Sequence, residues 1–201
     1  MEIYSLEYKY FYLIFVLPNN KKNLNMKHII AFAGSNSSTS INKQLAAYAA
    51  SLVSGVEVTV LDLNDFKLPL YGMDLELSDG IPDNAQKFLD IVKSTDGIVL
   101  SLAEHNGAYA TVFKNLFDWM SRIDGKLWND KPMLLMATSP GARGGATVLE
   151  IAQGRFGYMG GNIVSSFSLP SFDDNFSDGK ITNEELNNQL LEEVEQFTES
   201  L

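Results

Sequence analysis

Residues 98–119 read IVLSLAEHNGAYATVFKNLFDW and contain one strand–turn–helix unit. The run from Ile98 to Ala103 is apolar apart from one serine, which predicts a strand buried within a sheet. Glu104 to Gly107 form a polar turn, and after it large apolar side chains recur every three or four residues, which predicts a helix. These helical positions are Tyr109, Val112, Phe113, Leu116, Phe117 and Met120. A buried strand that leads into an amphipathic helix is typical of a parallel sheet covered by helices.

The same alternation of strand and helix continues on both sides of this unit. Further strands are predicted at 28–33, 56–63, 132–138 and 162–168, and helices at 41–52, from Pro82, through Val148 and Ile151, and after a capping box formed by Thr182 and Glu185. Residues 64–80 contain Pro69 and Gly72 and are interpreted as a long surface loop. Five strands alternating with helices, without repeats or an interdomain linker, predict one three-layer α/β domain with a parallel sheet.

Composition excludes several kinds of site. The chain has 201 residues, no cysteine and a formal net charge of −10. Disulfides, thiol nucleophiles and thiolate metal sites are therefore excluded, and the acidity argues against a nucleic-acid binder. Nine carboxylates and one lysine lie between Ser171 and Leu201, so the rest of the chain is close to neutral. With two histidines, no GxSxG motif and no zinc-ligand spacing, neither a classical hydrolase nor a metal site is expected.

The first 25 residues differ from the rest of the chain. Their one apolar run, residues 11–17, is far shorter than the ~20 residues that a membrane-spanning helix needs. The segment also lacks the basic start and the cleavage site of a secretory signal. We expect residues 1–25 to be an extension that is disordered or a non-native start, residues 26–201 to form the domain, and the protein to be cytoplasmic.

Three loops follow predicted strand ends, which is where ligands bind in sheets of this kind. The first, GSNSSTSIN at 34–42, places five hydroxyl side chains ahead of a helix and favours a single phosphate. The alternative for this loop is a polar segment with a helix-capping serine. The second, AEHNGAYA at 103–110, offers His105, Asn106 and Gly107 to a polar ring, although His105 could also be an ordinary surface side chain.

The third loop, SPGARGG at 139–145, has glycines that let the backbone approach a ligand. Its Arg143 could pair with a phosphate or remain solvated. The apolar stripe of the 109–120 helix is wider than one sheet contact requires. Core packing is its default explanation, and a subunit interface is a further hypothesis.

These three loops, in this order, resemble the NADPH-dependent FMN reductase family, a flavodoxin-like group that includes quinone, azo-dye and chromate reductases. The family's GSxRxxSxN, PEYNGSxPxxLKNxxDW and SPGxxGG-like segments are matched at Gly34, Ser35, Ser40 and Asn42, then at Glu104, Asn106, Gly107, Lys114, Asn115, Asp118 and Trp119, then at 139–145. The resemblance covers residues 26–170 and implies a flavodoxin-like three-layer sandwich with sheet order 2-1-3-4-5. The chain departs from the family pattern at Ser37, which is often Arg, at Ala103, usually Pro, and at His105, usually Tyr.

The resemblance also implies the ligands. FMN would be the bound cofactor, with NADPH or NADH as reductant, and no catalytic acid or metal would come from the protein. The implied cofactor-binding residues are Ser35, Ser40, Ile41 and Asn42 around the phosphate, Glu104, His105, Asn106 and Gly107 along the flavin ring, and Ser139 and Gly141 on its other side.

The function that follows is an oxidoreductase in which hydride passes from NAD(P)H through FMN to a quinone-like or other small acceptor. By the same resemblance we expect a homodimer or homotetramer formed through the 109–120 helix. A flavodoxin-like electron carrier is the alternative, although the first loop lacks a TxTGxT pattern and the acidity is concentrated in the tail. A third hypothesis is a binding module that has lost the flavin.

Overall fold

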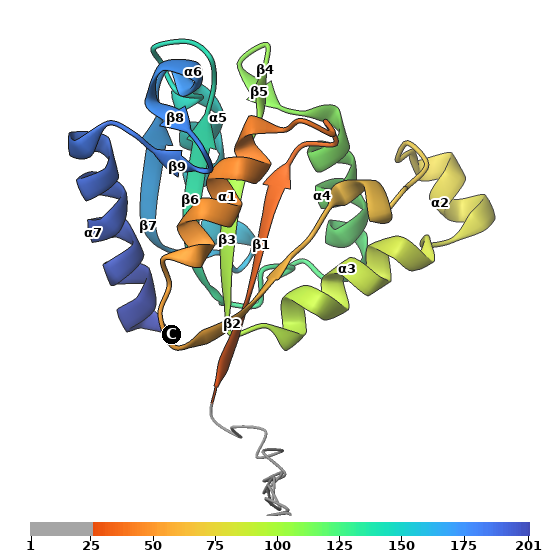
Figure 1. Cartoon of the computed structure of the whole chain (residues 1–201). Helices are drawn as coiled ribbons and strands as arrows, with labels where there is room; N and C mark the ends of the chain where they lie inside the picture. The colour runs from red at the N-terminus through yellow and green to blue at the C-terminus, as the bar shows by residue number, and fades with distance from the viewer. Residues whose placement is uncertain (1–25) are drawn as a thin grey trace, which may run out of the picture.

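The computed structural model describes residues 26–201, which fold around one parallel sheet of five strands (Figure 1). The strands lie in the order β2-β1-β3-β6-β7, which confirms the predicted flavodoxin-like order. Their bounds are Lys27–Gly34 for β1, Val56–Val60 for β2, Gly97–Leu102 for β3, Pro132–Thr138 for β6 and Asn162–Leu169 for β7. The extension predicted for residues 1–25 lies outside the described residues.

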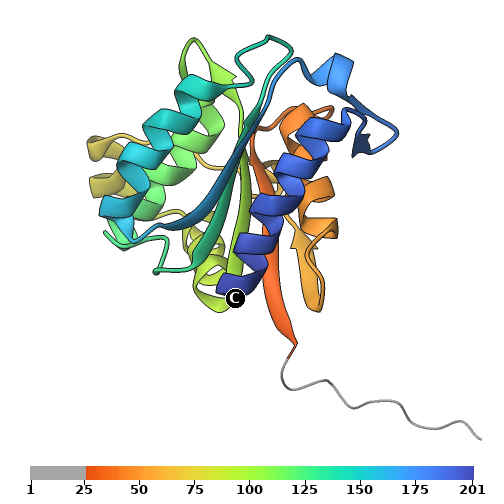
Figure 2. The ribbon, with the colours of Figure 1, turned by 90° about the vertical axis from the view of Figure 1, so that its left-hand side faces the viewer.

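Helices cover both faces of the sheet (Figure 2). One layer contains α1 (Ile41–Ser51) and α7 (Glu184–Ser200), and the other contains α3 (Asp83–Ser94), α4 (Thr111–Ile123) and α5 (Ala146–Phe156). Alternate side chains of β1 enter the two cores: Ile29 and Ala31 lie on the α1 side, and Ile30 and Phe32 lie on the other. Burial on both faces explains why this strand is a continuous apolar run.

The wide apolar stripe of α4 is buried within the chain's own core. Phe113, Leu116, Phe117 and Met120 are at most 6% exposed and pack in the core cluster that contains Phe156. Core packing therefore accounts for the width of the stripe, and the predicted subunit interface through this helix stays a prediction. The helix starts later than predicted, because Tyr109 belongs to a short strand, β5 (Ala108–Tyr109).

The segment predicted as a loop at 64–80 contains two short helices, a 3-10 turn η1 (Leu63–Asp65) and α2 (Met73–Asp79). No residue of α2 is buried, so the sequence has no apolar periodicity that would predict it. Side chains of α4 hold the intervening backbone in place. Asn115 donates to Pro69 O at 3.0 Å and accepts from Tyr71 N at 2.8 Å, while Trp119 Nε1 donates to Pro69 O at 2.8 Å.

The prediction for the start of the last helix is wrong by one residue, because the side chain of Asn183, rather than Thr182, caps α7 by accepting from Leu186 N.

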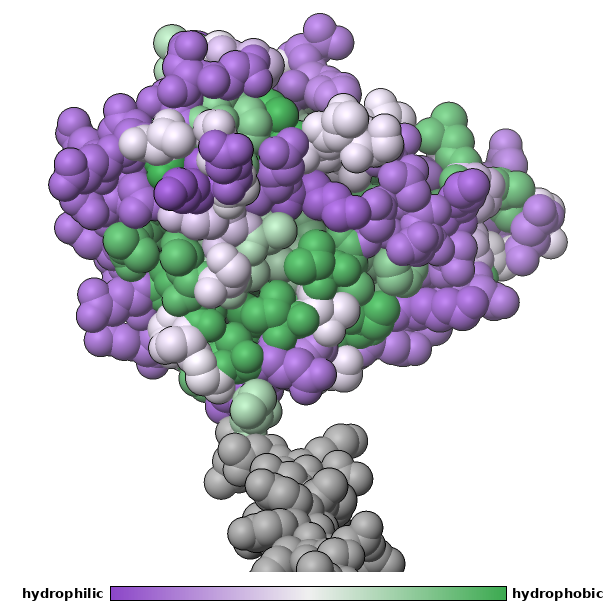
Figure 3. Space-filling model, viewed as in Figure 1, coloured by the Kyte–Doolittle hydropathy of each residue, from purple (hydrophilic) through white to green (hydrophobic). Residues whose placement is uncertain are grey.

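The edge strand β2 is the most exposed strand of the sheet, with Val58 and Val60 36% and 45% exposed. An apolar area is visible on this face of the molecule in Figure 3. Among residues 26–201, no helix is both long and apolar enough to span a membrane.

Candidate functional site

The three loops singled out in the sequence meet at the carboxyl end of the sheet, at the top of Figure 1. They enclose a cavity of about 250 Å³ next to β1 and β3, the central strands where ligands bind in this architecture. The lining residues are Ser35, Ser37, Thr39, Ser40, Ile41, Asn42, Ala103, Glu104, His105, Thr138, Ser139 and Pro140. The loops therefore form a single site, as their positions after strand ends predicted.

The first loop supplies hydrogen-bond donors. Ser40 is the N-cap of α1, and its hydroxyl oxygen accepts from Lys43 N at 3.2 Å, so the alternative interpretation of a capping serine is correct for this residue. Within residues 26–201, the N–H groups of Ile41 and Asn42 have no hydrogen-bond partner, as is usual for the first turn of a helix. Together with the hydroxyls of Ser35 and Thr39, these N–H groups form a set of donors suited to an anion.

The side chain of Asn42 has a structural role, and the phosphate contact expected of this residue stays a prediction. It is 3% exposed, and its carboxamide makes three of its four possible hydrogen bonds to the protein. Its Nδ2 donates to Thr138 O at 3.1 Å, and its Oδ1 accepts from Thr138 N at 3.0 Å and from the Ser101 hydroxyl at 2.7 Å. Asn42 therefore joins α1 to β3 and β6 beneath the cavity, and its backbone N–H has no partner within residues 26–201.

The second loop is a hairpin, formed by β4 (Glu104–His105) and β5. Asn106 and Gly107 have φ values of 53° and 72°, which is the Asn-Gly pattern of a two-residue hairpin turn. This turn explains the choice of both residues without a ligand. They do not line the cavity, whereas His105 is exposed on its border.

Glu104 connects the second loop to the third. Its Oε2 accepts from the backbone N–H of Val148 at 3.0 Å, in the first turn of α5. Gly145, the N-cap of α5, has no side chain with which to cap the helix, so the carboxylate of Glu104 serves that purpose and also favours the positive end of the helix dipole. The predicted flavin contact of Glu104 is thus accompanied by a structural role.

In the third loop, only Ser139 and Pro140 line the cavity. Gly141 is exposed, and its carbonyl accepts from Ser171 N at 3.0 Å. Gly144 and Gly145 have φ values of 57° and 77°, and a Cβ at either would lie 2.9 Å from Leu169 O or from Ala137 Cβ. The two glycines therefore serve close packing against β7 and β6 rather than the approach of a ligand.

The cavity carries no unpaired cation among its lining residues. Lys43, in the first turn of α1, is paired with Asp62 at 2.5 Å. This hydrogen bond and the one from Asn64 N hold the pKa of Asp62 below its usual value. Arg143 is exposed, donates to Thr147 Oγ1 at 3.0 Å and does not line the cavity. In the described part of the chain, no group of three His, Asp or Glu side chains is placed to hold a metal ion.

Comparison with known proteins identifies the family. Residues 27–174 match the family described as NADPH-dependent FMN reductase. The chain belongs to this family. It is 35% identical over 133 residues to a 2-hydroxy-1,4-benzoquinone reductase of Burkholderia sp, a match that covers 65% of this chain and 70% of that protein. It is 30% identical to an NADPH:quinone oxidoreductase of Arabidopsis thaliana, covering 62% of this chain and 64% of the relative.

Solved structures agree with this family. The chain is similar to the flavoenzyme NAD(P)H:(acceptor) oxidoreductase FerB from Paracoccus denitrificans, with a TM-score of 0.69, 25% identity and coverage of 87% of this chain and 96% of that one. A flavodoxin from Bacillus cereus shares the fold alone, with a TM-score of 0.55, 18% identity, and coverage of 87% of this chain and 99% of that chain.

The residues of this FMN reductase family member fit FMN. Hydroxyls and free first-turn N–H groups can hold one phosphate without a cation, which suits a chain with Ser37 where the family often has Arg. Of the ten predicted cofactor-binding residues, Ser35, Ser40, Ile41, Asn42, Glu104, His105 and Ser139 line the cavity, while Asn106, Gly107 and Gly141 lie outside its lining. Prediction from the sequence missed the lining roles of Ser37, Thr39, Ala103, Thr138 and Pro140, although four of the five belong to the same three loops and Thr138 is the last residue of β6, directly before the third loop.

Proposed function

We propose that this protein binds FMN in the cavity between its three loops and uses NAD(P)H to reduce quinone-like acceptors. The observation that carries the proposal is the cavity itself, in a chain whose residues 27–174 match NADPH-dependent FMN reductases. Relatives named for the reduction of benzoquinones and quinones support the class of acceptor. The cytoplasmic location and the oligomeric state stay predictions from the sequence.

When bound, FMN supplies the redox chemistry by accepting hydride from the nicotinamide and passing electrons to the acceptor. The chain's own residues would bind the cofactor and hold it in position. The hydroxyls of Ser35 and Thr39 and the N–H groups of Ile41 and Asn42 would donate to the phosphate. This arrangement needs neither a protein nucleophile nor a protein acid.

Two contacts described above hold the loops around the cavity. The carboxamide of Asn42 fixes the start of α1 against β6, and the carboxylate of Glu104 fixes the hairpin against α5. His105, at the exposed border of the cavity, would lie beside the ring and beside the entry path of the reductant and acceptor. The loops are thus preorganised by contacts within the protein, and binding does not have to order them.

The first experiment is equilibration of the purified full chain with FMN, followed by desalting, an absorption spectrum and anaerobic mixing with NADPH or NADH. We expect the protein to stay yellow, to bleach on mixing and to regain its colour when a 1,4-benzoquinone is added. Colourless protein after desalting, or bound flavin that neither nucleotide bleaches, would refute the proposal.

Paired variants of the first loop test the site itself. Thr39 lines the cavity and Ser38 does not, although both are exposed in the same loop. Thr39→Val keeps the side-chain shape and removes one donor, so we expect the Kd for FMN to rise about three- to tenfold. Ser38→Ala should leave that Kd unchanged, and equal effects of the two substitutions would count against this placement of the phosphate.

A further inference from the structure

A groove extends away from the candidate flavin cavity toward the 63–70 segment. Its nearer part, about 460 Å³, shares His105 with the flavin cavity. Its farther part, about 340 Å³, shares Asn36, Leu68, Val112 and Asn115 with the nearer part, so the two are continuous. Both volumes lie within the ~300–1,000 Å³ range of small-molecule sites. A ligand with one end at the flavin, beside His105, could therefore extend its other end along this groove.

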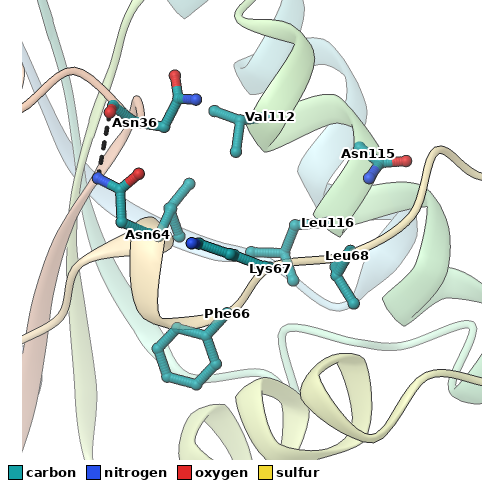
Figure 4. A pocket seen from close by; sticks show the side chains of 9 residues that line it. Asn36, Asn64, Phe66, Lys67, Leu68, Val112, Asn115 and Leu116 are labelled. Atoms are coloured by element: carbon teal, nitrogen blue, oxygen red, sulfur yellow. Dashed lines mark hydrogen bonds between the residues drawn. The ribbon is translucent and has the colours of Figure 1, made fainter.

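The walls of the groove are held by specific bonds. On one side, Asn115 and Trp119 of α4 both donate to Pro69 O, as described above. On the other side, Asn64 Nδ2 donates to Asn36 O at 3.1 Å and so ties the 63–70 segment to the first loop (Figure 4). Hydrogen bonds therefore fix the shape of the groove. Among its walls, α4 alone is a long regular element.

The far part of the groove combines an apolar floor with a few polar groups. Leu63, Phe66, Leu68, Val112 and Leu116 supply the apolar surface. The side-chain amide of Asn36 and the Oδ1 of Asn64 have no hydrogen-bond partner within residues 26–201, which leaves them available to a ligand. A flat, apolar heterocycle with polar edges is the kind of group that such a lining binds.

Lys67 supplies the charge in this part of the groove. Figure 4 shows its side chain crossing the pocket, with the ammonium nitrogen toward Asn64. Lys43 on α1 and Lys114 on α4 are paired with Asp62 and Asp118. Among the ion pairs of residues 26–201, Lys67 has no partner, so its charge is available to an anion.

We propose that this groove binds the adenosine end of the dinucleotide reductant and that Lys67 contacts the 2′-phosphate, which gives the protein a preference for NADPH over NADH. The inference rests on the proposed function, because the nicotinamide must lie at the flavin. The order of groups along the dinucleotide then matches the groove: nicotinamide at His105, diphosphate in the nearer part, and adenosine in the part that Lys67 lines. Lysine is well suited to a terminal phosphate, which it binds as a point charge.

Charge variants of Lys67 test the proposal by equilibrium binding. The probes are 2′,5′-ADP and NADP⁺, compared with 5′-AMP and NAD⁺, titrated calorimetrically into FMN-loaded protein at low ionic strength. For Lys67→Glu we expect the Kd of both 2′-phosphorylated probes to rise at least about tenfold, equivalent to ~1.4 kcal/mol, and the Kd of the other two to change far less. Lys67→Arg should restore most of the affinity, and high salt should reduce the difference, since the contact is exposed.

Two controls separate this contact from general charge effects. Lys87 is an exposed lysine on α3 that does not line the groove, so Lys87→Glu should leave all four Kd values unchanged. Arg143, on the third loop, is the competing cation. If Arg143→Glu rather than Lys67→Glu selectively weakens the 2′-phosphorylated probes, the proposal is overturned.

The remaining outcomes are equally decisive. Equal losses for all four probes in Lys67→Glu would place the lysine at a shared phosphate and refute the assignment to the 2′-phosphate, as would no loss at all. Bleaching of the flavin by NADH tests the proposed function separately. If neither nucleotide bleaches the flavin, the proposed function is refuted. A selective loss of 2′,5′-ADP binding in Lys67→Glu would still show that Lys67 contacts the 2′-phosphate.

Discussion

Substitution of Asn42 by alanine should lower stability rather than only flavin affinity. Asn42→Ala leaves three buried groups without partners, namely the N–H and C=O of Thr138 and the hydroxyl of Ser101. Thr138 and Ser101 are at most 1% exposed, but Thr138 also lines the cavity, so water can replace only part of the lost bonds. Each such group costs about 1–3 kcal/mol. Three such groups together amount to about 3–9 kcal/mol, and because water from the cavity makes up part of the loss, we expect the free energy of unfolding to fall by about 3–6 kcal/mol. That is a large part of the ~5–15 kcal/mol typical of a domain.

Urea unfolding of the flavin-free protein, followed by far-ultraviolet circular dichroism, measures this loss. Ser101→Ala removes one of the three bonds and should cost about 1 kcal/mol, which keeps the test valid if Asn42→Ala does not fold. The double variant should cost less than the two losses added together, because both partners of one bond are then absent. Ser38→Ala, exposed in the same loop, is the control and should change stability by less than about 0.5 kcal/mol. If Asn42→Ala unfolds like the unsubstituted protein while its FMN affinity falls, the side chain binds the ligand and does not hold α1 to the sheet.

Three further predictions concern other contacts. Glu104→Ala removes the acceptor for Val148 N and should lower the free energy of unfolding by about 1–2 kcal/mol in urea; an unchanged value would mean that α5 does not depend on this cap. Tyr109→Phe removes a buried hydroxyl that has no partner among the described residues, so stability at pH 7 should be equal or higher. Burial raises the folded-state pKa of Tyr109 to about 12, above the ~10 of an unfolded chain. The neutral phenol therefore makes its full contribution to the free energy of unfolding below pH 10, and that contribution is lost between pH 10 and 12. Urea unfolding at pH 9 and 11 should accordingly show a smaller alkaline loss for the variant, and identical losses would exclude this tyrosine as a cause. Gly97→Ala places a Cβ 2.9 Å from Phe197 Cζ, where α7 packs on β3, and should cost about 1–3 kcal/mol by thermal unfolding; a neutral result would show that the C-terminal turn of α7 yields freely.

The central fold was predictable because burial on both faces of the sheet leaves a strong signal. Strands such as β1 and β3 are continuous apolar runs, and α4 has a regular apolar stripe. The short helix α2 could not be predicted, since none of its residues is buried and bonds from Asn115 and Trp119 fix the backbone that precedes it. Those bonds join residues more than 40 positions apart, beyond the reach of local patterns.

The site was predictable as a set of loops but not as a set of contacts. All three loops were identified because each follows a strand end and is rich in hydroxyl residues, in glycine or in an Asn-Gly pair. In the structure they lie around one cavity. The sequence could not tell which polar side chains face the ligand and which face the protein. Asn42 and Glu104 turned inward to satisfy backbone groups of neighbouring elements, and Gly144 was required by close packing against β7. Lys67 lacked any motif, and only the folded arrangement brings it to the groove.

The placement of the two tryptophans has a spectroscopic consequence. Trp119 and Trp128 are the only indoles in the chain, both are almost fully buried, and both belong to the α4 side of the sheet. Fluorescence excited at wavelengths that tryptophan absorbs and tyrosine does not would therefore report on the α4 side of the sheet alone. Trp119 donates to the carbonyl that borders the groove, whereas Trp128 lies among aromatic rings of the core. A single-indole protein made by Trp128→Phe would then emit from beside the groove, and energy transfer from Trp119 to a bound yellow chromophore would give occupancy without an added label.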